Sequence, residues 1–165
     1  MDLQNNFTKG ITNFTNKQID ALIIIMMYLG IDFGKKRIGL ALGQLIPKGA
    51  GVIDGSKSLE EIVSAIKEIC VENEVDEIVI GWPKKLSGDL GDIAGDIKAF
   101  SENLKENIGL PIHFEEEELT SVEAEDMIRE SGKRFSRESG KTDEIAAILI
   151  LERYISHLSE SNKEE

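Results

Sequence analysis

Acidic side chains occur at three points in the sequence where a carboxylate could do chemistry. Asp32 lies within the apolar run 28–33, and a run of four glutamates occupies positions 115–118. Asp143 falls in the first turn of the last predicted helix. Carboxylate oxygens are the ligands that Mg²⁺ and Mn²⁺ favour. If the fold brought these groups together, they could hold divalent ions that activate water for hydrolysis.

Each acidic position also has a simpler explanation, which the residues alone leave open. Asp32 could cap the turn that follows its strand. Asp143 could be favoured by the positive end of the helix dipole. The glutamate run could be solvated. Strand alternation separates positions 115 and 117 from positions 116 and 118, but it does not choose between the two pairs.

The sequence gives little sign of other metal or redox chemistry. His113 and His157 are isolated, so no Cys/His cluster suggests zinc. The single cysteine, Cys70, cannot form an intramolecular disulfide. It falls on the apolar stripe of a predicted helix, as a buried core residue would. This cysteine usage fits a reducing compartment, and we expect a cytoplasmic protein.

Strands and helices that could position these carboxylates alternate along the chain. Apolar runs at 28–33 and 37–42, joined by a glycine-containing turn, predict a β-hairpin to which 51–53 could add a third strand. A capping box at Ser58 and Glu61 opens a helix. Strands are then predicted at 76–81 and 111–115, and helices at 92–107, 120–130 and 142–157. This order predicts an α/β fold: a mixed five-stranded sheet, with a three-strand meander and then alternating helices and strands, flanked by helices.

The chain of 165 residues has the length of one domain. We expect this domain to span residues 27–157. Residues 1–26 would form an N-terminal extension that is disordered or precedes the true start, and residues 158–165 a polar C-terminal tail. The apolar run 21–29 is too short to span a membrane, and the segment before it lacks a secretory signal pattern. We therefore expect no membrane association.

The net charge of −12 is unusual for a protein that binds nucleic acid, because phosphate contacts come largely from Lys and Arg. Many of the basic residues, however, are concentrated in three loops, at 35–37, 84–85 and 133–141. The charge balance argues against a general nucleic-acid coat, but it is compatible with a basic rim around an acidic site.

Four segments, in order over residues 27–155, resemble the YqgF/RuvX family of the RNase H-like superfamily. Residues 28–39, YLGIDFGKKRIG, are similar to the family's aliphatic strand followed by D-x-G-x-K-R-x-G. Residues 78–83, IVIGWP, with glycines at 88 and 91, resemble V-V-G-x-P and its glycine-marked loop. Residues 116–124, EEELTSVEA, match D-E-R-L-T-T-x-E-A, and residues 141–147, KTDEIAA, resemble a K-x-x-D-type ending.

The resemblance implies an RNase H-like fold and a metal-dependent endonuclease that hydrolyses phosphodiester bonds, in 5′-end processing of pre-16S rRNA during ribosome biogenesis. Older descriptions call the family Holliday junction resolvases, which would make branched DNA the substrate. Carried over by motif, the catalytic and Mg²⁺- or Mn²⁺-binding residues would be Asp32, Glu117 and Asp143. We expect the positive charge for the substrate backbone to come from Lys36, Arg37 and Lys141. We also expect a monomer or weak homodimer.

Two departures from the family motif fall in the glutamate run. Glu116 stands where the motif has Asp, and Glu118 stands where it has Arg, which reverses a charge beside the implied metal site. Glutamate cannot contact a phosphate as arginine does. A non-catalytic relative that binds RNA or protein is therefore an alternative. Another is a sugar-kinase or actin-like ATPase, which shares the fold and the D-x-G turn but clamps nucleotide between two such domains.

Overall fold

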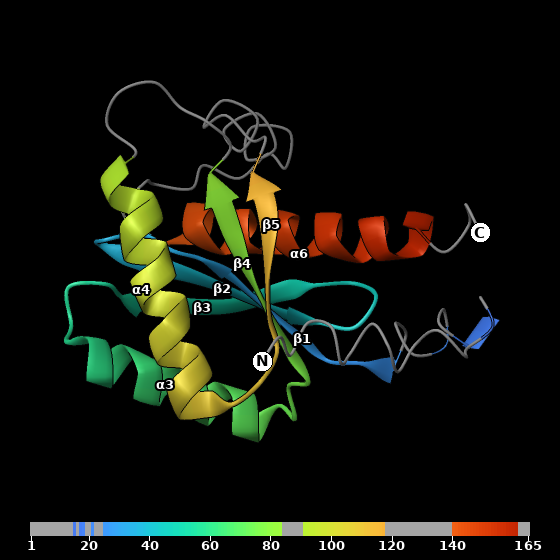
Figure 1. The fold of residues 1–165 in the computed structure, drawn as a ribbon, viewed down its shortest axis with the longest axis horizontal. Coiled ribbons are helices and arrows are strands. Elements are labelled where there is room, and N and C mark those ends of the chain that lie inside the picture. The colour runs from blue at the N-terminus through green and yellow to red at the C-terminus, as the bar shows by residue number, and fades with distance from the viewer. Residues whose placement is uncertain are drawn as a thin grey trace.

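The computed structural model describes residues 25–83, 91–117 and 140–161, together with residues 15, 17, 18 and 21. The main elements follow the order β1, β2, β3, α3, β4, α4, β5 and α6 (Figure 1). Within these ranges, no helix is long and apolar enough to cross a membrane.

A mixed five-stranded sheet forms the centre of the protein, with the strand order β3-β2-β1-β4-β5. Its strands are β1 (Tyr28–Asp32), β2 (Arg37–Gly43), β3 (Lys48–Asp54), β4 (Glu77–Pro83) and β5 (Ile112–Glu117). The first three strands pair antiparallel as a meander, whereas β4 and β5 run parallel to β1. The predicted mixed sheet is therefore confirmed, and the C-terminal ends of β1, β4 and β5 lie at the same edge.

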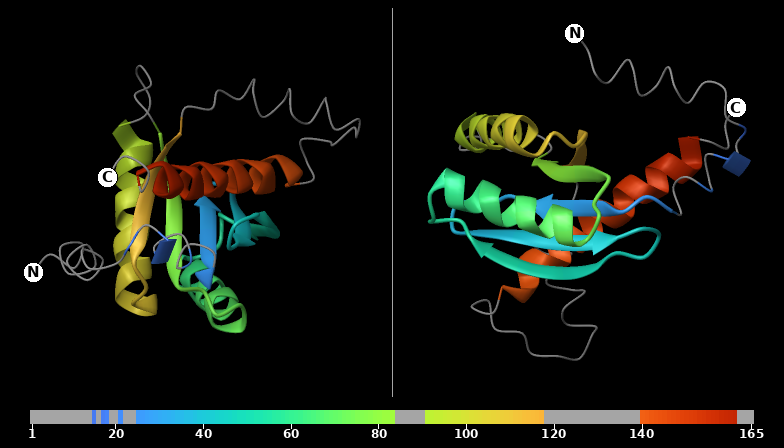
Figure 2. Two further views of the ribbon diagram at one scale, coloured as in Figure 1. Left: turned by 90° about the vertical axis from the view of Figure 1, so that its right-hand side faces the viewer. Right: turned by 90° about the horizontal axis from the view of Figure 1, so that it is seen from below.

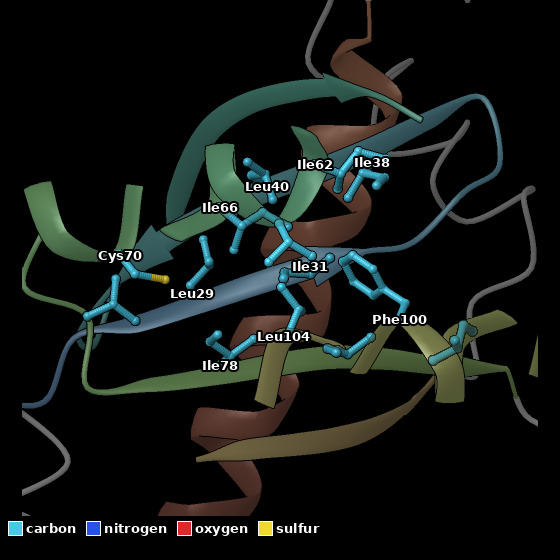
Figure 3. Packing of buried hydrophobic residues seen from close by; sticks show 14 residues of the cluster. Leu29, Ile31, Ile38, Leu40, Ile62, Ile66, Cys70, Ile78, Phe100 and Leu104 are labelled. Atoms are coloured by element: carbon cyan, nitrogen blue, oxygen red, sulfur yellow. The ribbon is translucent and has the colours of Figure 1, made fainter. Parts of the chain in front are cut away.

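Helices cover both faces of this sheet (Figures 1 and 2). On one face lie α3 (Leu59–Glu72) and α4 (Gly91–Ile108), and the larger core forms between them and the sheet. Figure 3 shows this core, in which Leu29 and Ile31 of β1 face the helices. On the other face lies α6 (Lys141–Ser161), which packs with Tyr28, Ala41 and Val79 in a second cluster. The two-residue period of the strands thus separates two cores.

The capping box predicted at the start of α3 is present. The backbone N–H of Glu61 donates to the side-chain oxygen of Ser58, and the carboxylate of Glu61 accepts from the backbone N–H of Ser58 at 3.0 Å. Because these contacts satisfy backbone donors that the first helical turn leaves unpaired, they fix where the helix begins.

Several elements are longer than the sequence predicted. β3 begins at Lys48 rather than 51, β4 includes Trp82 and Pro83, and β5 continues to Glu117. In each case the apolar pattern covers a shorter span than the pairing with the neighbouring strand, as between Leu42 and Lys48 and between Pro83 and Glu117. Helix α6 also runs to Ser161, so part of the expected tail is helical. The helix predicted at 120–130 lies outside the described residues.

Candidate metal centre

Asp32 is the last residue of β1 and is partly buried. Strand alternation puts it on the same face as Tyr28 and Gly30. Tyr28 packs edge-on against Tyr154 of α6, with ring centroids 5.8 Å apart. Asp32 is therefore on the face of the sheet that α6 covers, at the edge where the parallel strands end.

Gly39 explains how α6 comes close to Asp32. In the antiparallel pairing of β1 and β2, Gly39 lies directly opposite Asp32. A Cβ atom added to Gly39 would collide with the backbone carbonyl of Asp143, at the start of α6. One helical turn later, a Cβ on Gly30 would lie 2.9 Å from the carbonyl oxygen of Ala147. The missing side chains let the helix backbone rest on the sheet, and Asp143 is thereby brought beside Asp32's strand partner.

Asp143 forms an ion pair with Arg37. The Nε–H of Arg37, the first residue of β2, donates to Oδ2 of Asp143 at 2.7 Å. The side chains are 42% and 22% exposed, respectively, so the pair lies at the rim of the helix–sheet contact. The sequence led us to expect Arg37 to bind the substrate backbone. In this structure it neutralises one of the expected metal ligands.

The two expected substrate-binding lysines flank this pair. Lys36 precedes β2 and is exposed, while its backbone carbonyl accepts from Gly55 N at 3.0 Å. Lys141 begins α6, is 50% exposed, and places Nζ 4.0 Å from Oε2 of Glu144. Both lysines are therefore exposed to solvent and lie within two residues of Arg37 or Asp143 in the sequence, as groups that contact a phosphate backbone could.

Glu117 is the last residue of β5, opposite Pro83 at the end of β4. Two positions earlier, Glu115 pairs with His157 of α6 at 2.9 Å. The two-residue period assigns position 117 to this same face of the sheet. The side chain of Glu117 lies outside the described part of the structure, as do Glu118 and the basic groups at 84–85 and 133–137.

The donor chemistry of this region fits a hard divalent cation. Two acidic residues adjoin Gly39: Asp32 is its strand partner, and the backbone of Asp143 lies over it. Oxygen ligands of this kind suit Mg²⁺ or Mn²⁺ and not a structural zinc ion. Among the described side chains, no three His, Cys, Asp or Glu residues are grouped to hold a metal. The third expected ligand, Glu117, is not among those side chains.

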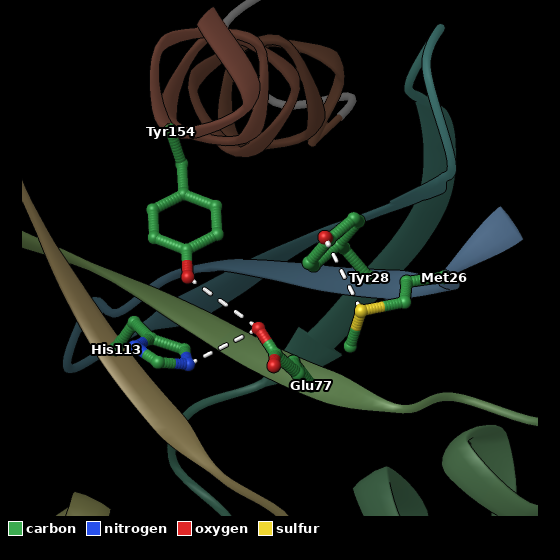
Figure 4. Close-up of polar contacts among 5 residues, drawn as sticks. All are labelled: Met26, Tyr28, Glu77, His113 and Tyr154. Atoms are coloured by element: carbon green, nitrogen blue, oxygen red, sulfur yellow. Dashed lines mark hydrogen bonds and ion pairs between the residues drawn. The ribbon is translucent and has the colours of Figure 1, made fainter. Parts of the chain in front are cut away.

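A second polar cluster, which the sequence analysis missed, lies under the middle of α6 (Figure 4). Its centre is Glu77, the first residue of β4, only 3% exposed. Tyr154 donates its hydroxyl hydrogen to Oε2 of Glu77 at 3.4 Å, and Nε2 of His113 lies 3.1 Å from the same oxygen. The His113 contact is close enough for charge pairing, but within the described residues Nε2 makes no hydrogen bond, and neither does Oε1 of Glu77.

This cluster joins β4, β5 and α6. Burial, followed by the charge of Glu77, raises the pKa values of Tyr28 and Tyr154, so both phenols stay neutral and can act as donors. Burial also raises the pKa of Glu115, against the opposing effects of His157 and Arg153. These contacts hold α6, which carries Asp143, in a defined position on the sheet. A glutamate at the start of an apolar strand was the signal that could have revealed the cluster.

The sequence matches the RuvX family, described as Holliday junction resolvase, over residues 26–157. A relative from Agathobacter rectalis is 38% identical over 141 residues, covering 82% of this chain and 99% of that protein. One from Synechococcus elongatus is 35% identical over 139 residues, covering 82% and 92%. Both carry the name "Putative pre-16S rRNA nuclease".

Solved structures show the same fold. The chain is similar to T. thermophilus RuvC in complex with a Holliday junction substrate, with a TM-score of 0.56, 17% identity, and coverage of 81% of this chain and 97% of that one. A second Thermus thermophilus RuvC structure gives a TM-score of 0.52 at 18% identity, covering 80% and 96%. The fold is thus that of the RuvC-like, RNase H-fold proteins.

Proposed function

Because this chain belongs to the RuvX family, we propose that it is a metal-dependent endonuclease that hydrolyses phosphodiester bonds in nucleic acid. The observation that carries the proposal is the approach of α6 to β2 at Gly39, which places Asp143 beside the strand partner of Asp32. Both acidic residues therefore lie next to the same position, and carboxylates brought together repel each other unless positive charge lies between or beside them. The arrangement therefore suits a site built to hold divalent ions.

We propose that the ligands are Asp32, Glu117 and Asp143 and that the ion is Mg²⁺ or Mn²⁺. Bound there, such an ion lowers the pKa of a water molecule and stabilises negative charge on a phosphate. The protein's own contribution is to hold the carboxylates on rigid elements: Asp32 ends a central strand, and Asp143 begins a helix packed on the sheet. Lys36 and Lys141 provide exposed positive charge for the phosphate backbone that flanks the scissile bond.

The substrate we propose is the 5′ region of pre-16S rRNA, which would place the protein in ribosome biogenesis in the cytoplasm. The names of the relatives support this substrate. The description of the family supports a second candidate, a branched DNA junction. Glu118, which replaces the arginine of the family motif, favours a third, a non-catalytic RNA- or protein-binding relative. We expect the active form to be a monomer or weak homodimer.

The test is a cleavage assay with the full chain. Pre-16S-like RNA, a four-way DNA junction and linear duplex DNA are each incubated with Mg²⁺, Mn²⁺ or EDTA. Asp143→Asn removes one ligand charge with almost no change in shape. Asp96→Asn is the matched control, because the Asp96 side chain is 45% exposed and lies on α4, which covers the face of the sheet opposite to α6 (Figure 2).

Cleavage that needs metal, survives in Asp96→Asn and is lost in Asp143→Asn would support the nuclease, and the preferred substrate would separate RNA processing from junction resolution. Full cleavage by Asp143→Asn would refute the ligand assignment. Metal-independent binding of RNA by the folded wild type, without cleavage under any condition, would favour the binding relative.

A further inference from the structure

The ion pair between Arg37 and Asp143 joins residues that lie 106 positions apart in the sequence. Arg37 approaches from the sheet and Asp143 from the helix, and the close contact at Gly39 keeps their backbones in place. The 2.7 Å distance between Nε and Oδ2 is typical of a charge-assisted hydrogen bond. The guanidinium therefore occupies one oxygen of an expected metal ligand.

Arg37 supplies a positive charge at a point where acidic residues are close together. Asp32 pairs with Gly39 and the backbone of Asp143 lies over Gly39, so two acidic residues adjoin the same position, and negative charges brought together repel each other. Arg37 supplies a counter-charge in direct contact with Asp143, whereas Lys141, two positions away, lies near Glu144. Arg37 thus balances the negative charge of Asp143, as a bound cation would.

The pair is also exposed enough to open. Arg37 keeps 42% of its side-chain surface in water, so its head group can leave Asp143 without disturbing the core. Ion pairs at such positions are weak, since solvent screens them and ordering a long side chain costs entropy. A divalent ion that binds the carboxylate of Asp143 would have to displace the guanidinium of Arg37 from it. The positive charge of the guanidinium would also repel the ion.

We propose that Arg37 is an internal counter-ion of Asp143 that competes with the divalent cation, so that it stabilises the metal-free protein and weakens metal binding. This inference rests on the proposed function, because it takes Asp143 as a metal ligand. It assigns Arg37 a role in tuning the site that is distinct from contact with the substrate backbone.

The test measures Mn²⁺ binding to the full chain by calorimetry, and thermal unfolding in EDTA, for wild type and Arg37→Gln. The substitution should tighten Mn²⁺ binding by roughly two- to fivefold, the upper part of the range that corresponds to loss of an exposed ion pair. It should also lower the melting temperature in EDTA. A purely structural role would instead reduce stability and metal affinity together.

Lys35→Gln is the matched control, because it removes a positive charge two residues from Arg37. Lys35 pairs with Asp96 on α4 and not with Asp143. It should change Mn²⁺ affinity by less than about twofold, as expected for a screened surface charge. Arg37→Lys keeps the charge but lacks the Nε donor, and it should fall between wild type and Arg37→Gln.

Mn²⁺ binding that is unchanged or weaker in Arg37→Gln would overturn the inference while leaving the proposed function intact. An equal increase in Mn²⁺ affinity in Lys35→Gln would also overturn it, since the loss of any nearby positive charge would then explain the effect. Failure of the folded wild type to bind Mn²⁺ at all would instead overturn the proposed function, and the inference with it.

Discussion

Gly39 of β2 lies directly beneath the backbone of Asp143, so closely that a single added methyl group would collide with the carbonyl of Asp143. The same glycine is the strand partner of Asp32. One residue without a side chain therefore sets the distance between an expected metal ligand on the sheet and another on the helix. The site depends on this contact as much as on the carboxylates themselves.

Gly39→Ala should push the start of α6 away from the sheet. We expect a loss of about 1 to 3 kcal/mol in the free energy of unfolding, the usual cost of overpacking, and a weaker affinity for Mn²⁺. Denaturant unfolding and calorimetry measure the two effects. Gly95→Ala is the control: Gly95 is an exposed position of α4 where an added Cβ would meet no described atom within 4 Å, so alanine should stabilise by up to about 1 kcal/mol. Equal behaviour of the two variants would contradict the role of Gly39.

Asp32→Asn should separate function from stability. We expect metal-dependent cleavage to fall by roughly 100-fold or more, as when an enzyme loses one group that stabilises transition-state charge. In EDTA the variant should remain folded, because Asn has nearly the same shape as Asp and position 32 is the last residue of its strand. Single-turnover cleavage and chemical denaturation are the measurements. A variant that cleaves normally would exclude Asp32 as a ligand.

Tyr154→Phe should destabilise the protein more than Tyr28→Phe. Both rings are buried and pack against each other, but only the Tyr154 hydroxyl donates to the carboxylate of Glu77; that of Tyr28 meets the sulfur of Met26 at 3.7 Å. Removing a donor from a buried carboxylate should cost about 1 to 2 kcal/mol, whereas loss of the sulfur contact should cost about 0.5 kcal/mol or less. Urea unfolding at pH 7 measures both. Equal losses would show that Glu77 does not need the Tyr154 hydroxyl.

Cys70 should be unreactive in the folded protein. The side chain is buried in the core between α3 and the sheet, and burial raises the pKa of its thiol to about 11. At pH 8 the reactive thiolate is then on the order of one molecule in a thousand. Labelling with a disulfide reagent should be at least about 100-fold slower in the native state than in denaturant. It should accelerate as the pH rises toward 11. Rapid native labelling at pH 8 would contradict this burial.

Local patterns in the sequence predicted most of the elements. Two apolar runs around Ile31 and Leu40, joined by a glycine-containing turn, mark the hairpin, and the Ser58–Glu61 box marks the start of α3. Both signals arise from residues close together in the chain. The ends of β4 and β5 were predicted too early. Their final residues, Pro83 and Glu117, are in strands because they pair with each other, and the apolar pattern of either segment does not record that pairing.

The sequence by itself determined the types of chemical group and the elements that carry them: an aspartate ending a central strand, glutamates ending another, and an aspartate opening the last helix. The tertiary structure decided which groups meet. It set Asp143 over Gly39, gave Arg37 a carboxylate partner in place of open solvent, and buried Glu77 beside Tyr154. The physical reason is distance along the chain. Periodicity and capping act over a few residues, whereas these contacts join segments 77 to 106 positions apart and exist only once α6 has packed on the sheet.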